Sequence, residues 1–171
     1  MFEKMINTIL HKDIIESQKM IVIFLKITAI ILMLTGCTSS SDKGEVLPFT
    51  TIGKFILGGS EGISKQDIII NTQGKWENLK SAMGVQVTNS FNETEIDFDK
   101  YQVLAVFDEV RNTGGWEIVI TKITGYKENL SVNVKVNKKS CVAVPLEMTQ
   151  PYHIVKTHQI LKTIEFKYVN N

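Results

Sequence analysis

The feature that most constrains the fold is a series of short strand-like segments between residues 101 and 169. Residues 103–107 are apolar at every position, which predicts a central strand that is covered on both faces. Residues 130–136 and 163–169 alternate apolar and polar side chains, which predicts strands with one buried face and one solvated face. Residues 116–124 and 141–148 add two more strands, the second bent by Pro145. Consecutive strands joined by short turns predict a mainly β fold, either an antiparallel meander or a small sandwich.

The first half of the folded part adds two strands and one helix to this pattern. Residues 49–57 and 67–70 have the length and composition of strands. Residues 72–83 place Trp76, Leu79 and Met83 at helical spacing, and Gly84 provides a stop. We therefore expect an α+β variant of the mainly β class, in which a single helix packs on one sheet face. Residues 88–99 are polar and acidic, and we expect a loop there.

Composition limits the domain number and the classes of partner. A chain of 171 residues has room for one domain, and 43% hydrophobic with 22% charged residues is typical of a globular protein. The formal net charge is +1. Such a balanced charge gives no electrostatic attraction to a polyanion, so we expect no nucleic-acid partner.

The N-terminal segment has the pattern of an export signal. Residues 27–34 form an apolar run, which Lys19 and Lys26 precede with positive charge. The run is too short to span a bilayer, which needs about 20 apolar residues. Residues 34–37 (Leu-Thr-Gly-Cys) follow it and resemble the bacterial lipobox, in which the cysteine is acylated and becomes the first residue of the mature chain. The resemblance implies a signal peptide over residues 1–36 and a lipid, palmitate included, on Cys37.

Several expectations follow from a lipidated Cys37. Residues 37–47 are Ser-rich at their start and would form a tether, and the folded domain would span residues 48–171. Acyl chains contribute about 0.8 kcal/mol for each buried CH₂, so several chains on one residue anchor a protein stably. The expected location is the bacterial cell envelope, at the outer membrane or the outer face of the cytoplasmic membrane. Acidic residues within 1–19 are unusual in a signal peptide, and Met20 is an alternative start.

The residues that usually carry chemistry are sparse. With Cys37 acylated, Cys141 has no partner, so we expect no disulfide and interpret Cys141 as a small buried hydrophobic residue. His153 and His158 lie five residues apart, around an expected turn, and no Cys or His cluster completes a zinc site. The sequence contains no nucleophile elbow, phosphate-binding glycine loop or zinc-protease motif. We expect a protein that is not an enzyme and has no metal or cofactor.

Two segments are candidates for binding a protein partner. The first is a turn whose paired glycines allow a close backbone approach before a tryptophan that either caps the core or is presented at the rim. The second follows Pro151, and if it is a strand its tyrosine and histidine point to opposite faces. We interpret the histidine as a hydrogen-bonded structural residue. The candidate residues are Asn112, Thr113, Gly114, Gly115 and Trp116 in the first segment, and Tyr152 and His153 in the second.

These segments resemble a known family. Residues 101–107 (Tyr-Gln-Val-Leu-Ala-Val-Phe), 113–118 (Thr-Gly-Gly-Trp-Glu-Ile) and 151–156 (Pro-Tyr-His-Ile-Val-Lys), in this order, resemble the PrcB C-terminal domain family over about residues 96–169. The chain differs in having Trp116 where tyrosine is commoner, and Arg111-Asn112 where a proline often precedes the turn. The family is named after a subunit of an exported protease complex that supports the protease without being the peptidase. The resemblance implies an accessory, protein-binding role and transfers no catalytic residue.

A second resemblance leaves an alternative function open. The Asn-Thr-Gly-Gly-Trp turn of residues 112–116 resembles one loop of chagasin-type cysteine-protease inhibitors, in which loops at one end of a β-sandwich block the active-site cleft. The alternative to an accessory module is therefore a protease inhibitor. The oligomeric state and the partner's identity are not predicted by the sequence.

Overall fold

The structure is a computed structural model that describes residues 43–138 and 146–169. Strands dominate the described residues, and the helical part is small. The elements in chain order are β1 (Glu45–Leu47), β2 (Phe49–Leu57), β3 (Gln66–Ile70), α2 (Gln73–Met83), α3 (Val85–Thr88), β4 (Tyr101–Phe107), β5 (Trp116–Gly125), β6 (Asn129–Lys138), β7 (Gln150–His158) and β8 (Thr163–Tyr168).

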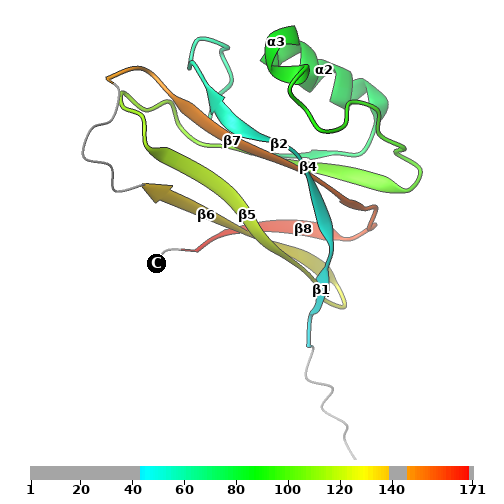
Figure 1. Cartoon of the computed structure of the whole chain (residues 1–171). Coiled ribbons are helices and arrows are strands. Elements are labelled where there is room, and N and C mark those ends of the chain that lie inside the picture. The colour runs from blue at the N-terminus through cyan, green and yellow to red at the C-terminus, as the bar shows by residue number, and fades with distance from the viewer. Residues whose placement is uncertain (1–42, 139–145, 170–171) are drawn as a thin grey trace, which may run out of the picture. The chain divides into compact units, whose positions relative to one another are not determined.

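The strands form two sheets, which decides between the two predicted architectures in favour of the sandwich (Figure 1). One sheet has the order β1-β5-β6-β8 and the other has the order β2-β7-β4-β3. The meander is absent because the chain passes from one sheet to the other between β4 and β5, and again between β6 and β7. The pairing also differs from a purely antiparallel fold, since β8 runs parallel to β6. The chain reaches β8 from β7 in the other sheet, so β6 and β8 are not joined as a hairpin.

Strand β4 is covered on both faces, as its unbroken apolar run predicts. Val103 to Phe107 are all 0% exposed. Leu104 and Val106 pack between the two sheets, whereas Val103, Ala105 and Phe107 pack toward the helices. The inter-sheet core consists of Leu104, Val106, Ile118, Ile120, Ile123, Leu130, Val132, Val134 and Val155.

The predicted helix is confirmed in place and in its buried face. The Thr72 side chain accepts a hydrogen bond from the Lys75 amide at 3.4 Å and caps the start of α2. Trp76, Leu79 and Met83 are the buried residues of α2, and they pack on the sheet that contains β2 and β4. The short helix α3, which was not expected, follows α2 directly.

Some sequence expectations need correction. Glu45–Leu47 do not belong to a tether, because they pair with β5 as strand β1. His153 and His158 are not separated by a turn, since both lie in β7. The expected strand over residues 141–148 is wrong for residues 146–148, which form no strand and precede an isolated bridge between Arg111 and Thr149.

Several expectations fall outside the described residues. They are the signal peptide over residues 1–36, lipidated Cys37, the start of the tether, and the segment 141–145 that contains Cys141 and Pro145. Within the described part of the chain, no helix is long and apolar enough to cross a bilayer.

Candidate functional site

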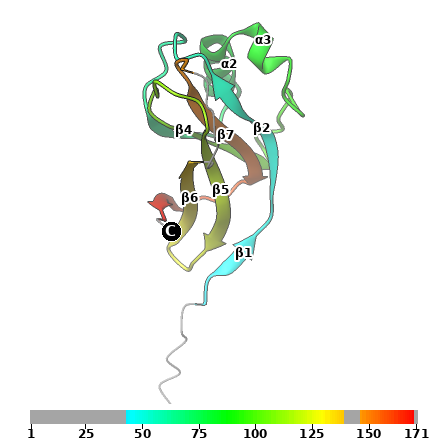
Figure 2. The same cartoon turned by 60° about the vertical axis from the view of Figure 1, so that its left-hand side comes forward.

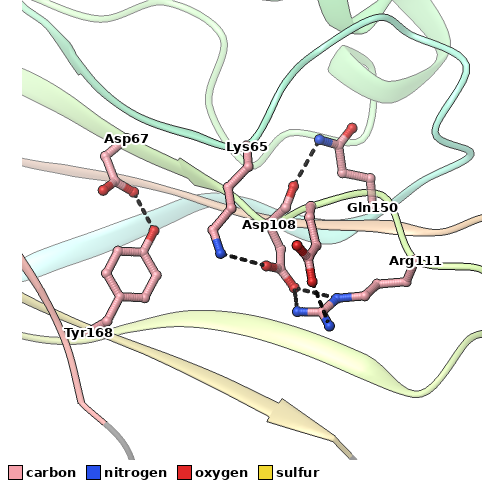
Figure 3. Close-up of polar contacts among 7 residues, drawn as sticks. Lys65, Asp67, Asp108, Arg111, Gln150 and Tyr168 are labelled. Carbon is pink, nitrogen blue, oxygen red and sulfur yellow. Dashed lines mark hydrogen bonds and ion pairs between the residues drawn. The ribbon is translucent and has the colours of Figure 1, made fainter.

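A buried ion pair organises the turn between β4 and β5. The Asp108 side chain is 0% exposed, and its Oδ2 accepts hydrogen bonds from Nε and Nη2 of Arg111 at 3.1 and 2.9 Å. Lys65 Nζ lies 3.8 Å from the other carboxylate oxygen, and Gln150 Nε2 donates to the Asp108 carbonyl at 2.9 Å (Figure 3). A buried carboxylate needs such partners, because an unpaired charge costs several kcal/mol. The pair therefore fixes the position of the Arg111 guanidinium.

Further hydrogen bonds hold the rest of the turn. The backbone groups of Arg111 and Thr149 bond to each other at 2.7 and 2.8 Å, and the Thr149 hydroxyl donates to the Thr113 carbonyl at 2.9 Å. Gly115 has φ of +86°, a conformation that glycine adopts without strain. The turn reaches Trp116, the first residue of β5, in a defined conformation.

Trp116 is half-buried beneath two cations. The Arg111 guanidinium carbon lies 3.9 Å from the centre of the indole ring, and Lys138 Nζ lies 5.3 Å from it. A guanidinium at this distance is attracted by the negative face of the ring. Asp108, Arg111 and Trp116 thus form a continuous series of contacts from the core to the surface.

Trp116 borders a hollow of about 220 Å³ between β2 and the start of β5, which we call the Trp116 hollow. Strand β2 forms its other wall, and the Lys54 ammonium reaches across to the Glu117 carboxylate at 2.6 Å. Tyr152 also borders the hollow, but it is 1% exposed and its ring stacks on Phe107 with 6.0 Å between centroids. The lining residues are Lys54, Phe55, Ile56, Trp116, Glu117, Ile118 and Tyr152.

His153 joins the two sheets and does not line this hollow. Its Nδ1 accepts a hydrogen bond from the Ile120 backbone amide at 2.9 Å, so its proton is on Nε2, which lies 3.0 Å from the Thr51 hydroxyl oxygen. Burial, aided by the nearby Lys54 and opposed by Glu117, lowers the pKa of His153 to about 4. Its neighbour Tyr152 faces the opposite side of β7, as the strand period predicts. The geometry supports the interpretation of His153 as a structural histidine.

The structure brings only part of the predicted binding set together. Trp116 and Tyr152 share the hollow, whereas residues 112–115 lie on the turn beside it, with Asn112 exposed and Gly114 buried. Sequence reasoning missed the β2 wall, because nothing in a single sequence indicates that β2 lies next to β5. It also missed Asp108 and Arg111, although their spacing directly after a fully apolar strand is a signal that could have been used.

The described residues contain no group of three His, Cys, Asp or Glu side chains placed to hold a metal ion. The site offers an aromatic ring, apolar side chains and a few paired charges, which are the components of a surface that binds a protein.

Comparison with known proteins supports the resemblance that the motifs indicate. Residues 102–158, about a third of the 171-residue chain, match the family model described as PrcB C-terminal. The comparisons with curated proteins and with solved structures gave no match. The matched segment runs from β4 to the end of β7 and includes the turn with Trp116 and the strand with Tyr152 and His153. Over residues 102–158 the chain is therefore similar to the PrcB C-terminal family.

Proposed function

We propose that this protein is a non-catalytic accessory module that binds another protein, and that the partner is an exported protease which it helps to assemble or stabilise. The observation that carries the proposal is the match of residues 102–158 to the PrcB C-terminal family. The Trp116 hollow supplies a surface with the chemistry that such a role requires.

The ring of Trp116 is suited to a binding surface because its position is set before a partner arrives. Arg111 covers it at 3.9 Å and is itself held by the buried Asp108. Tryptophan and arginine are enriched among the residues that dominate binding energy at interfaces, and an ordered side chain loses little entropy on binding. The partner would contact Trp116 and the adjoining turn.

The binding role can be tested by replacing Trp116 with alanine in the full chain, expressed in its native envelope. The partner is cross-linked, captured and quantified, and the matched control is Leu161→Ala, a change at a side chain that is 95% exposed on another strand connection. We expect capture of one specific partner to fall at least about tenfold for Trp116→Ala, the effect of losing a typical hot spot, and to remain unchanged for the control. Equal capture by both variants, with intact folding, would remove Trp116 from the binding surface.

The same captured partner distinguishes an accessory module from an inhibitor. If the partner is a protease whose activity or half-life falls when this protein is removed, the accessory role is supported. If the purified protein instead blocks papain-like proteases, the chagasin-like alternative holds and the accessory role is wrong.

We further propose that Cys37 carries a lipid that anchors the protein in the bacterial envelope, outside the cytoplasm. The proposal is supported by the lipobox-like sequence before Cys37 and the apolar run that precedes it. A Cys37→Ser variant should lose incorporation of labelled palmitate and leave the membrane fraction, whereas Cys141→Ser should keep both. Continued labelling of the Cys37→Ser variant would show that the lipid is elsewhere.

A further inference from the structure

Strand β2 is an edge strand, and only one of its sides is paired. It is the first strand in the order β2-β7-β4-β3, and it forms one edge of that sheet (Figure 2). The outer side of an edge strand presents backbone N–H and C=O groups that can pair with another strand. Which residues present these groups follows from the register.

The hydrogen bonding of Pro151 shows which backbone groups of β2 point toward β7 and which point outward. It has no N–H, and its carbonyl accepts a hydrogen bond from the Asp108 amide at 3.0 Å, on the side of β4. Ile56 lies directly opposite Pro151, so this pair exchanges no hydrogen bonds and the N–H and C=O of Ile56 point away from β7. Residues two apart on a strand point the same way, and the backbone groups of Lys54 therefore also face outward.

The open part of the edge is short. At its start, the Asn92 amide and side chain donate to the carbonyls of Ile52 and Thr51 at 2.8 and 3.0 Å. At its end, the Gly58 amide donates to Glu61 Oε1 at 3.1 Å. Within the part of the chain that the structure describes, no hydrogen bond takes up the outward backbone groups of Lys54 and Ile56.

An apolar side chain lies between these two residues. Phe55 is 73% exposed and Ile56 is 39% exposed, values that are high for large apolar residues in an ordered strand. The only charge on this stretch, Lys54, is paired with Glu117 of its own chain. A lysine on an edge strand often prevents pairing with another strand, but the ammonium of Lys54 is held toward Glu117 of the other sheet and away from the edge.

We propose that this edge binds a second copy of the same chain, with the two β2 strands antiparallel about a two-fold axis at Phe55. Lys54 would then lie opposite Ile56 of the second copy, and Ile56 opposite Lys54 of the second copy. Because the outward groups belong to residues 54 and 56, both of these pairs are hydrogen-bonded and together they satisfy all the open groups. Phe55 faces Phe55 of the second copy in the intervening, closely spaced pair.

A second copy fits this edge better than an unrelated strand because the open stretch is self-complementary. A two-fold interface requires the same residues on both sides, and the register about Phe55 meets that requirement without placing like charges directly opposite each other. Lys54 and Ile56 of each copy line that copy's own Trp116 hollow, so the pairing also brings the two hollows close together on the same face of the joined sheet. The contact is small, so we expect a weak dimer that attachment of both copies to one membrane would favour.

The register can be tested with a disulfide, using the full chain in detergent and in a Cys37→Ser, Cys141→Ser background. Phe55→Cys should give a cross-linked dimer on mild oxidation, because facing residues in a closely spaced antiparallel pair have the Cα separation of a disulfide. Val85→Cys is the matched control, since Val85 is also apolar and also 73% exposed. We expect at least about tenfold more dimer from Phe55→Cys than from Val85→Cys. Equal yields would overturn the proposed register.

Sedimentation of the full chain without added cysteines tests the contact itself. Self-association should weaken at least about tenfold in Phe55→Lys, which places like charges opposite each other, and in Ile56→Pro, which removes one outward N–H. Val85→Lys should have no effect, and circular dichroism reports whether each variant is folded. Self-association through the N-terminal apolar run would be insensitive to all three changes and would contradict the proposal, as would a monomer at every concentration. Protection of the Lys54 and Ile56 amides by a different protein alone would also overturn it.

Discussion

Acid should loosen the contact between the two sheets, because His153 must be neutral to make it. Its Nδ1 accepts the Ile120 amide, and a protonated ring would have a hydrogen there in place of a lone pair. The pKa of His153 is lowered from 6.5 to about 4, first by burial and second by Lys54, with Glu117 acting in the opposite direction. Protonation of the folded state is therefore costly.

The sign and size of the effect follow from linkage. Between pH 6.5 and about 4 the unfolded chain binds a proton at this residue and the folded chain does not, so stability falls as the pH falls through this window. One pKa unit corresponds to about 1.4 kcal/mol, so His153 accounts for a loss of about 2 kcal/mol at pH 5 and about 3 kcal/mol near pH 4. Above about pH 7.5, where the unfolded histidine is also neutral, its contribution is constant.

The measurement is urea unfolding of the full-length protein, followed by tryptophan fluorescence between pH 7.5 and 4.5. His153→Gln can keep both hydrogen bonds without titrating, so the difference between wild type and this variant isolates the histidine from the carboxylates. His158→Gln, at the exposed end of the same strand, is the control and should keep the wild-type dependence. An identical pH dependence in wild type and His153→Gln, or an imidazole that titrates at 6.5 or higher by NMR, would refute the reasoning.

Other substitutions test the packing and the turn by changes in the free energy of unfolding. Trp76→Ala should cost about 3–5 kcal/mol, because the indole is 0% exposed, and Trp76→Phe should cost less, since it loses mainly the 2.8 Å hydrogen bond to the Thr94 carbonyl. Asp108→Ala should cost about 1.5–3 kcal/mol, because Arg111 loses the hydrogen bonds to its buried carboxylate partner and keeps only the ion pair with Glu109 at 2.8 Å. A loss below about 1 kcal/mol in urea unfolding would argue against the Asp108–Arg111 pair as the organiser of the turn. Thr72→Ala should cost about 1 kcal/mol by removing the cap of α2, whereas Thr72→Ser should restore most of it.

The local pattern of the sequence predicted most of the elements. The unbroken apolar run of residues 103–107 predicted β4, and the spacing of Trp76, Leu79 and Met83 predicted both α2 and its buried face. The segment after Pro151 was expected to place Tyr152 and His153 on opposite faces only if it formed a strand, and β7 is that strand. Each of these properties depends on side chains a few residues apart, which have a definite geometry as soon as a helix or strand forms.

Only the tertiary structure decided which strands are neighbours. The parallel pairing of β6 with β8, the passage of the chain between sheets and the pairing of β1 with β5 all join segments that are far apart in sequence. Many pairings can bury the same alternating faces, so periodicity does not select among them.

The candidate site divides in the same way. The sequence by itself indicated the turn that ends in Trp116 and the segment that carries Tyr152, since glycines, aromatic residues and their order are visible in one chain. The tertiary structure decided that β2 forms the opposite wall, that Asp108 holds Arg111 over the indole, and that β2 has an open edge at Phe55. These features arise from contacts between distant segments, and such contacts form only when the two sheets pack against each other.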